Sequence, residues 1–444
     1  MSSPAPRLGV RDRTEPGPAR RPVGDLDLQD LEVPGAGVIA DGAALAGLLA
    51  EAGEDLLDRN YLRCKPGTSL VAGLRLASGP AFAYAVSAEA RPKLAKLVER
   101  APEGAVLVHS TTPSLLVARP AADRDLPALA KADRLSAAVG RPVATWDTLT
   151  YKPQRRWVGR PDGEDRPPEL VLRAYRPRDL PATMAGWRLA GQLGQAGVSA
   201  RLPGARTVSG RRGLAVVSWL PGTPLDRLLD AGPLDAGPMD AGPLDAGRLD
   251  SGLWADVGEP QLMLAEVGVA LAELHQALPP RPAEARPDAR ALRRVLSELS
   301  ALLPELRPRA TALLRTLEAR APRPTAGRPV HGDFSADQVI VGVDGRIGVT
   351  DWDRAGWGDP GADLGSLRAA GMSEPAYATV LEGYARVRPV PASAQWHGVA
   401  AAVQRLTEPL RQSRVHWRSE IGARLAQAER QLGGLASRPD GRCA

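Results

Sequence analysis

Short apolar runs separated by turn residues make up much of the chain before residue 220. Between residues 61 and 86, a Cys-Lys-Pro-Gly turn precedes apolar runs at residues 70–74 and 81–84. A similar order returns at residues 151–158 and 170–175, where a polar stretch separates the two runs. Runs of this length, bounded by Gly, Pro and Asp, are typical of β-strands. The pattern predicts two strand hairpins in this part of the chain.

The two hairpins share a local pattern. Aligning Lys65 with Lys152 brings Val71 opposite Val158, and the alignment uses two of only five lysines in the chain. We interpret this as a weak internal repeat, in which the first copy is an added or duplicated sheet element. Coincidence between two short hairpins is the alternative.

After the second hairpin, a helix is expected over residues 182–195 and a strand over 214–219, followed by a Leu-Pro-Gly break. Residues 225–252 then repeat the unit Leu-Asp-Ala-Gly-Pro. Because Pro and Gly in every unit exclude a helix, we expect a flexible insert without chemistry of its own. Its aspartates could instead attract a cationic acceptor such as an aminosugar.

The second half of the chain has helical periodicity. Apolar residues recur every three or four positions over residues 262–303, and another helical region covers about 394–435. Between them, the apolar runs 339–341 and 347–349 flank an Asp-Gly turn, which predicts a β-hairpin. The order indicates a sheet-rich part followed by a helix-rich part.

Charge and composition narrow the class of protein. The 444 residues carry a net charge of +6, but basic and acidic residues are interleaved, which argues against a nucleic-acid partner. No uncharged apolar run is long enough to span a bilayer and no secretory signal opens the chain, so we expect a cytoplasmic protein without a membrane partner. Cys64 and Cys443 lie far apart and indicate neither a disulfide framework nor a metal cluster. The oligomeric state is not readable from the sequence.

The predicted hairpin brings a set of polar residues together. His331, Asp333 and Gln338 have the spacing of the kinase catalytic loop, and Asp351 follows after the hairpin. Asp333 is the candidate base for phosphoryl transfer, and His331 is expected to hold the loop by hydrogen bonds. Gln338 and Asp351 are candidate magnesium ligands, while Asp353 is either a further ligand or a turn cap. The competing explanation is that these side chains merely cap turns at the hairpin ends.

Residues 330–364 resemble the signature of the aminoglycoside phosphotransferase and choline kinase family. His-Gly-Asp at 331–333 is similar to its catalytic loop, and Asp-Trp-Asp at 351–353 with Gly-Asp-Pro at 358–360 is similar to its metal loop. The resemblance implies a bilobal, protein-kinase-like α+β fold that uses ATP, or GTP, with Mg²⁺. It also implies that the backbone of Trp219 and Leu220 forms the hinge that meets the adenine.

Two departures from the family pattern bear on activity. Arg173 stands where a kinase has its phosphate-binding lysine, and the helix at 182–195 lacks the glutamate that pairs with that lysine. An arginine can bind phosphate without such a partner. Lys152 is a candidate substitute for the lysine, and Arg155 and Arg156 beside it either join this role or are surface residues. The other departure is Gln338 in place of the usual asparagine.

The expected organisation comprises a disordered lead-in (1–40), an N-terminal extension (41–145), an N-lobe with hinge (146–222), a repeat insert (223–255), a helical C-lobe (256–436) and a tail (437–444). The predicted activity is ATP- and Mg²⁺-dependent phosphoryl transfer to a hydroxyl of a small molecule such as a sugar, aminosugar or amino alcohol. A pseudokinase-like module that binds a nucleotide or a partner is the alternative.

Overall fold

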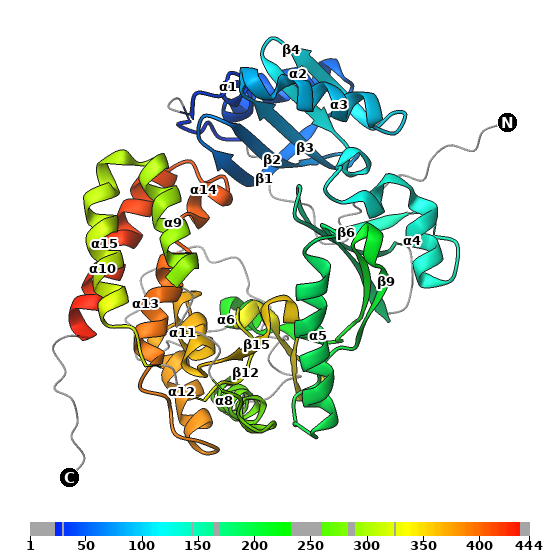
Figure 1. The fold of residues 1–444 in the computed structure, drawn as a ribbon. Coiled ribbons are helices and arrows are strands. Elements are labelled where there is room, and N and C mark those ends of the chain that lie inside the picture. The colour runs from blue at the N-terminus through cyan, green and yellow to red at the C-terminus, as the bar shows by residue number, and fades with distance from the viewer. Residues whose placement is uncertain are drawn as a thin grey trace, which may run out of the picture.

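The computed structural model describes residues 23–28, 31–143, 145–162, 169–231, 260–282, 289–323 and 326–435. The expected tail at 437–444, Cys443 and most of the repeat insert lie outside these residues. Figure 1 shows a first sheet at the top, a second sheet at the right, and helices at the left and bottom of the view. The α+β architecture predicted from the sequence is confirmed.

The first sheet belongs to the N-terminal extension and has the strand order β1-β2-β3-β5-β4. Its elements are α1 (Ala36–Ala40), α2 (Gly42–Glu51), β1 (Leu56–Lys65), β2 (Ser69–Leu76), β3 (Gly79–Val86), α3 (Arg91–Arg100), β4 (Val106–Thr111), β5 (Ser114–Ala118) and α4 (Ala132–Val139). All strand pairs are antiparallel. The expected hairpin at residues 61–86 is thus part of a larger sheet, because the stretch before the turn also forms a strand.

The second sheet has the order β6-β7-β8-β10-β9. Its elements are β6 (Trp146–Lys152), β7 (Arg156–Pro161), β8 (Leu170–Tyr175), α5 (Leu180–Gln195), β9 (Ala205–Ser209) and β10 (Leu214–Ser218). In both sheets three consecutive strands are followed by a helix and two further strands. Lys65 and Lys152 end the first strand of each sheet, and Val71 and Val158 are the third residues of the second strands. The two sheets thus share one connectivity, and the internal repeat stays a prediction.

The remaining elements are mostly helical. They comprise β11 (Thr223–Pro224), α6 (Leu225–Ala231), α8 (Pro260–Gln276), α9 (Ala289–Leu302), α10 (Arg307–Ala319), β12 (Arg328–Val330), β13 (Val339–Val341), β14 (Ile347–Val349), β15 (Gly356–Gly358), α11 (Gly361–Ala369), α12 (Glu374–Ala385), α13 (Ala394–Gln404), α14 (Glu408–Arg411) and α15 (Trp417–Leu435). The hairpin predicted around the Asp-Gly turn is β13–β14. Helix α6 occupies the start of the region expected to contain no helix, since its residues precede the first proline of the repeat, Pro233. No helix among the described residues is both long and apolar enough to cross a membrane.

The extension packs against both of the other parts. One face of its sheet meets the second sheet in a shared apolar core, where the rings of Phe82 and Tyr151 lie edge to face at 6.5 Å. The opposite face shares a core with α1, α2 and the helices α9, α10, α13 and α15. Helix α14 packs against β1, as Figure 1 shows at the upper left. The extension therefore connects the second sheet to the helical part.

The disordered lead-in expected through residue 40 is too long. Leu26, Leu28, Leu31 and Val33 are buried in the core beneath the first sheet. The buried guanidinium of Arg59 on β1 holds this segment, since it donates hydrogen bonds to the carbonyl oxygens of residues 24, 39 and 40. A few buried leucines and one buried arginine therefore order this stretch, although its composition suggested disorder.

Candidate active site

The catalytic-loop sequence lies between β12 and β13. Gly332 has φ = +79°, and a Cβ at this position would lie 2.4 Å from the carbonyl oxygen of Arg354. The turn therefore needs glycine for both its backbone conformation and its close approach. His331 is buried, and its Nε2 donates to the carbonyl oxygen of Thr350 at 2.7 Å. That bond joins the loop to the residue before Asp351, as expected of a residue that holds the loop.

A buried carboxylate supports the same loop from below. Asp363 on α11 accepts hydrogen bonds from the backbone N–H groups of His331 (2.7 Å) and Gly332 (2.8 Å). It also bonds His275 Nε2 at 3.0 Å, and His275 Nδ1 lies 2.9 Å from the Tyr384 hydroxyl. Burial acts to raise the pKa of Asp363, but the hydrogen bond and charge of His275 outweigh it and the pKa is lowered. Nothing in the sequence links Asp363 to His275, because 88 positions separate the two residues.

Asp333, the candidate base, is more accessible than Asp351 and Asp353. Its side chain is 37% exposed. Arg354 Nη1 lies 3.2 Å from Oδ2, and Arg405 Nη2 lies 3.3 Å from Oδ1. A carboxylate has about four lone-pair positions, so these two contacts leave room for a substrate hydroxyl.

The other two candidate carboxylates are paired with two arginines. Arg173 Nη1 on β8 lies 2.6 Å from Asp351 Oδ1 and 3.2 Å from Asp353 Oδ1. Arg156 Nη1, at the start of β7, lies 3.0 Å from Asp351 Oδ1 and 2.7 Å from Asp353 Oδ2. Helix α5 lacks a glutamate as expected, but Arg173 has two carboxylate partners on the metal loop. The alternative of a surface residue is wrong for Arg156. We call these four side chains the arginine–aspartate cluster.

The charges of the cluster interact strongly because the four side chains are largely shielded from water. Burial acts to lower the pKa values of Arg156 and Arg173, but the adjacent carboxylates outweigh it and raise both. Burial acts to raise the pKa of Asp351, yet Arg173 and Arg156 hold it well below its usual range. At neutral pH two positive and two negative charges therefore balance one another.

Helix α5 explains how the cluster exists without a helical glutamate. A Cβ on Gly186 would lie 2.1 Å from the carbonyl oxygen of Trp352, so the helix lies directly on the metal-loop turn. The next residue, Trp187, donates from Nε1 to Asp353 Oδ1 at 2.9 Å, and its ring centroid lies 5.0 Å from Arg173 Cζ. The partner carboxylate for Arg173 thus comes from the loop, and α5 supplies an indole that holds both.

The donor set bears on the predicted magnesium site. Asp351 and Asp353 match the preference of magnesium for carboxylate oxygens, with substrate phosphates and water completing its shell. The backbone of Gln338 is hydrogen-bonded to the residue before Asp351, since its carbonyl oxygen accepts from Thr350 N at 2.9 Å. The side chain of Gln338 instead donates from Nε2 to Asp337 Oδ2 at 2.6 Å. The described residues contain no group of three or more His, Cys, Asp or Glu side chains that could hold a metal. The carboxylates of Asp351 and Asp353 suit magnesium chemically. In this structure they are ion-paired with the guanidinium groups of Arg156 and Arg173.

The β6–β7 turn lines the site with positive charge. Lys152 ends β6, and its pKa is lowered by desolvation and by the charges of Arg156 and Arg155. Arg155 forms no ion pair with any described residue. Because the carboxylates of the cluster are already balanced, this turn leaves the surroundings positively charged, which suits phosphate.

The expected hinge lies beside the β13–β14 hairpin. The backbone N–H of Trp219 donates to the carbonyl oxygen of Glu169 at 2.9 Å. After Leu220, the chain enters β11, where Thr223 pairs with Val341 of β13. The segment therefore joins the second sheet to the hairpin that carries the catalytic and metal loops. Adenine contact by Trp219 and Leu220 stays a prediction.

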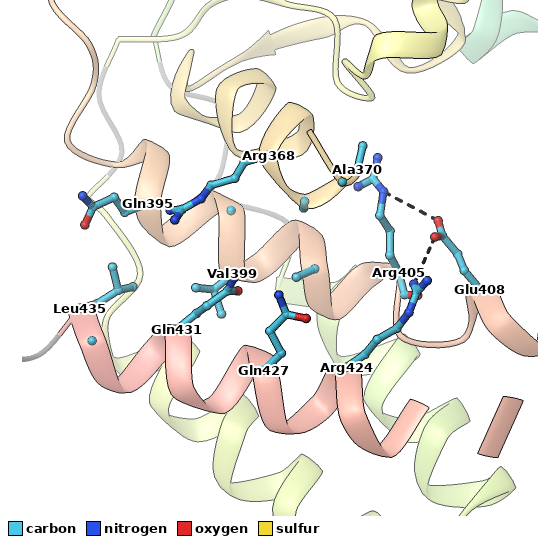
Figure 2. Close-up of a pocket in the computed structure, with 15 residues that line it drawn as sticks. Arg368, Ala370, Gln395, Val399, Arg405, Glu408, Arg424, Gln427, Gln431 and Leu435 are labelled. Atoms are coloured by element: carbon cyan, nitrogen blue, oxygen red, sulfur yellow. Dashed lines mark hydrogen bonds and ion pairs between the residues drawn. The ribbon is translucent and has the colours of Figure 1, made fainter. Parts of the chain in front are cut away.

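A pocket of about 470 Å³ lies between α11, α13 and α15. Figure 2 shows the amides of Gln427 and Gln431 on α15 facing α13, with Arg405 and Arg424 at one end and Glu408 between them. Arg405 also contacts Asp333. Arg405 therefore both lines the pocket and contacts the candidate base.

A five-stranded sheet joined to a helical part that carries a His-Gly-Asp loop is typical of a kinase-like phosphotransferase. Residues 150–401 match the sequence model of the phosphotransferase enzyme family, APH. This match covers more than half of the chain, which therefore belongs to the phosphotransferase enzyme family.

Several solved structures are similar to this chain. Macrolide 2'-phosphotransferase MphH from Brachybacterium faecium is 22% identical, with 66% of this chain and 96% of that chain covered and a TM-score of 0.40. Choline kinase LicA from Streptococcus pneumoniae is 12% identical, with coverage of 68% and 97% and a TM-score of 0.46. An ADP-bound aminoglycoside phosphotransferase, APH(2'')-Ib, is 15% identical, with coverage of 68% and 98% and a TM-score of 0.45. No curated protein matches the chain.

Proposed function

We propose that this protein transfers the γ-phosphoryl group of ATP to a hydroxyl of a small molecule, with Mg²⁺ as cofactor. The observation that carries the proposal is the placement of three functions around one hairpin. These functions are an accessible carboxylate at Asp333, a pair of carboxylates at Asp351 and Asp353, and a positively charged turn at Lys152 to Arg156. Phosphoryl transfer depends mainly on positioning and charge, and these groups supply both.

In this proposal, Asp333 orients the acceptor hydroxyl and takes its proton. The hydroxyl oxygen forms a bond to the γ-phosphorus while the bond between that phosphorus and the β–γ bridging oxygen breaks, and ADP leaves with those electrons. The two contacts to Arg354 and Arg405 fix the carboxylate against rotation. Charge balance is maintained because the proton remains on Asp333 until it passes to solvent or product.

The arginine–aspartate cluster has a second arrangement available when a nucleotide binds. Arg156 and Arg173 can turn from carboxylate to phosphate oxygens, since a guanidinium binds both in the same forked geometry. That exchange frees Asp351 and Asp353 as ligands. Magnesium held there would neutralise charge on the β- and γ-phosphate oxygens. Gln338 is the candidate for an additional ligand.

We place the acceptor in the pocket between α11, α13 and α15. Arg405 links this pocket to Asp333, and the amides of Gln427 and Gln431 offer both donors and acceptors. Such a lining suits a molecule with several hydroxyl groups, which agrees with a sugar, aminosugar or amino alcohol as the acceptor.

The test is transfer of labelled γ-phosphate from ATP to a fractionated extract of small metabolites in the presence of magnesium. We expect wild-type protein to label a product and Asp333→Asn to reduce its formation by at least about 10²-fold, the usual contribution of a positioned base. Asp344→Asn on the exposed β13–β14 turn is the matched control and should retain transfer. Unchanged turnover in Asp333→Asn would refute the assignment.

A nucleotide-binding module without catalysis is the second candidate, and the occupied carboxylates of the cluster favour it. The same assay separates the two. Clear magnesium-dependent ATP binding with no labelled product from any fraction would support the module over the enzyme.

A further inference from the structure

The N-terminal extension reaches the turn that carries the proposed phosphate-binding residues. Gln154 lies at the tip of the β6–β7 turn and has φ = +58°, a conformation that is unusual for a residue other than glycine. It is nevertheless buried, at 8% exposure. Such a conformation persists only where the surrounding structure holds it.

The support for Gln154 comes from two residues of the extension. Its backbone N–H donates to Asp123 Oδ2 at 2.7 Å. Its side-chain Oε1 accepts a hydrogen bond from Arg63 Nη2 on β1. The adjacent Pro153 lies against β2, where a Cβ on Gly73 would be 3.4 Å from its Cδ. Backbone and side chain of the turn are therefore both attached to the extension.

Asp123 is an unusual residue to find at this position. It is 2% exposed and follows the short 3-10 helix Pro120–Ala122. Its Oδ1 accepts from the backbone N–H of Asp125 at 3.1 Å, so half of the carboxylate caps its own turn. Among the described residues, its Oδ2 accepts only from the β6–β7 hairpin, namely from Gln154 N and from the Tyr151 hydroxyl at 3.1 Å.

A buried carboxylate is costly without a cationic partner, and no described arginine or lysine is ion-paired with Asp123. A neutral residue would cap the local turn at lower cost. The second carboxylate oxygen is needed only to accept hydrogen bonds from the hairpin. We therefore attribute the aspartate at this position to its support of the hairpin turn and not to the stability of the fold.

The turn also sets the position of the charged residues beside it. Arg156 begins β7 two residues after Gln154 and reaches Asp351 and Asp353 across the site. Lys152 ends β6 two residues before Gln154. A change in the conformation of Gln154 would move both side chains relative to the phosphates.

The extension is itself anchored on the helical part. Its sheet shares an apolar core with α9, α10, α13 and α15. Arg418 Nε on α15 also lies 2.8 Å from Asp27 Oδ2. The turn is thus attached through the extension to the part that carries Asp333, in addition to its connection through the hinge.

We propose that the extension holds the β6–β7 turn in the conformation that binds the nucleotide phosphates, with Asp123 and Arg63 as positioning residues. The proposal rests on the proposed function, since it requires that ATP binds at this turn. Neither residue touches the nucleotide. Both act through Gln154 on the residues that do.

The test compares the binding of ATP and of adenosine by calorimetry, using the full chain with magnesium. Asp123→Ala should weaken ATP binding by about tenfold, the loss expected for one charge-assisted hydrogen bond. Adenosine binding should be unchanged, because the turn is expected to contact phosphates and not the base. Tyr151→Phe is the matched control: it removes the other hydrogen bond to the same oxygen and should retain both affinities.

Arg63→Met provides a second route to the same result if Asp123→Ala fails to fold, because it leaves the buried carboxylate in place. It should also weaken ATP binding and leave adenosine binding intact. Equal losses for ATP and adenosine would mean a merely structural role and would overturn the inference, as would unchanged ATP binding. Wild-type protein that bound neither molecule would instead refute the proposed function itself.

Discussion

Replacement of Arg156 by methionine would test the electrostatic description of the arginine–aspartate cluster. Arg156 Nη1 contacts carboxylate oxygens of Asp351 and Asp353 at 3.0 and 2.7 Å, and these side chains are only 15–21% exposed. Removing the guanidinium leaves Arg173 alone against two carboxylates. The cluster then carries one uncompensated negative charge.

The size of the effect follows from this burial. Breaking a fully buried pair costs about 3–5 kcal/mol, whereas an exposed pair contributes about 0–1 kcal/mol. Arg156 lies between these limits but nearer the buried one. We expect Arg156→Met to reduce the free energy of unfolding by about 2–3 kcal/mol at neutral pH, measured by urea denaturation without nucleotide.

The same variant should respond differently to magnesium. Because Arg156 occupies the carboxylates in the absence of nucleotide, its loss should let magnesium stabilise the variant against thermal unfolding more than it stabilises wild type. Potassium chloride at equal ionic strength separates binding from screening. Arg155→Met on the same turn is the control and should behave as wild type in both measurements.

Two outcomes would contradict this reasoning. If Arg156→Met were as stable as wild type, the ion pairs of Arg156 would make no net contribution to the free energy of unfolding. If Arg155→Met lost as much stability as Arg156→Met, the effect would reflect the loss of any positive charge from the turn and not the specific contacts.

Two further predictions concern single residues. Burial raises the pKa of Asp123 to about 6, so the folded state binds this proton more tightly than the unfolded state does, and stability from this group falls as pH rises from about 4 to about 6. Asp123→Asn removes that dependence, so wild type should lose about 2 kcal/mol of unfolding free energy relative to the variant between pH 4 and pH 6, measured by urea denaturation; an equal difference at both ends would contradict it. Gly332→Ala forces a side chain into φ = +79° and against the carbonyl oxygen of Arg354, which displaces Asp333. Phosphoryl transfer should fall by about 10²-fold with ATP binding retained, and full activity would show that the loop tolerates the shift.

The sequence was informative wherever function depends on local spacing. The β13–β14 hairpin follows from two apolar runs and an Asp-Gly turn, and it is present as predicted. The loop around Gly332 and the role of His331 in holding it also follow from residues close together in the chain. These features need no knowledge of distant contacts.

Long-range partners could not be predicted in the same way. Arg156 and Asp351 are 195 positions apart, and nothing near either residue indicates the other. Helix α5 lacks glutamate, which suggested a missing ion pair, whereas the carboxylate comes from Asp353 on a loop that Gly186 allows to approach. A pattern in one segment can identify a required charge without identifying the segment that supplies it.

The two sheets show how one connectivity can serve different purposes. The strand register pairs Val71 with Tyr84 in the first sheet and Val158 with Arg173 in the second, so Tyr84 stands at the position equivalent to Arg173. Tyr84 is buried in the apolar core between the sheets, while Arg173 projects into the cluster of charges. The first sheet therefore lacks the arginine that we propose to bind phosphate in the second. In our proposal, its contribution is a surface on which Asp123 and Arg63 hold the charged turn of the second sheet.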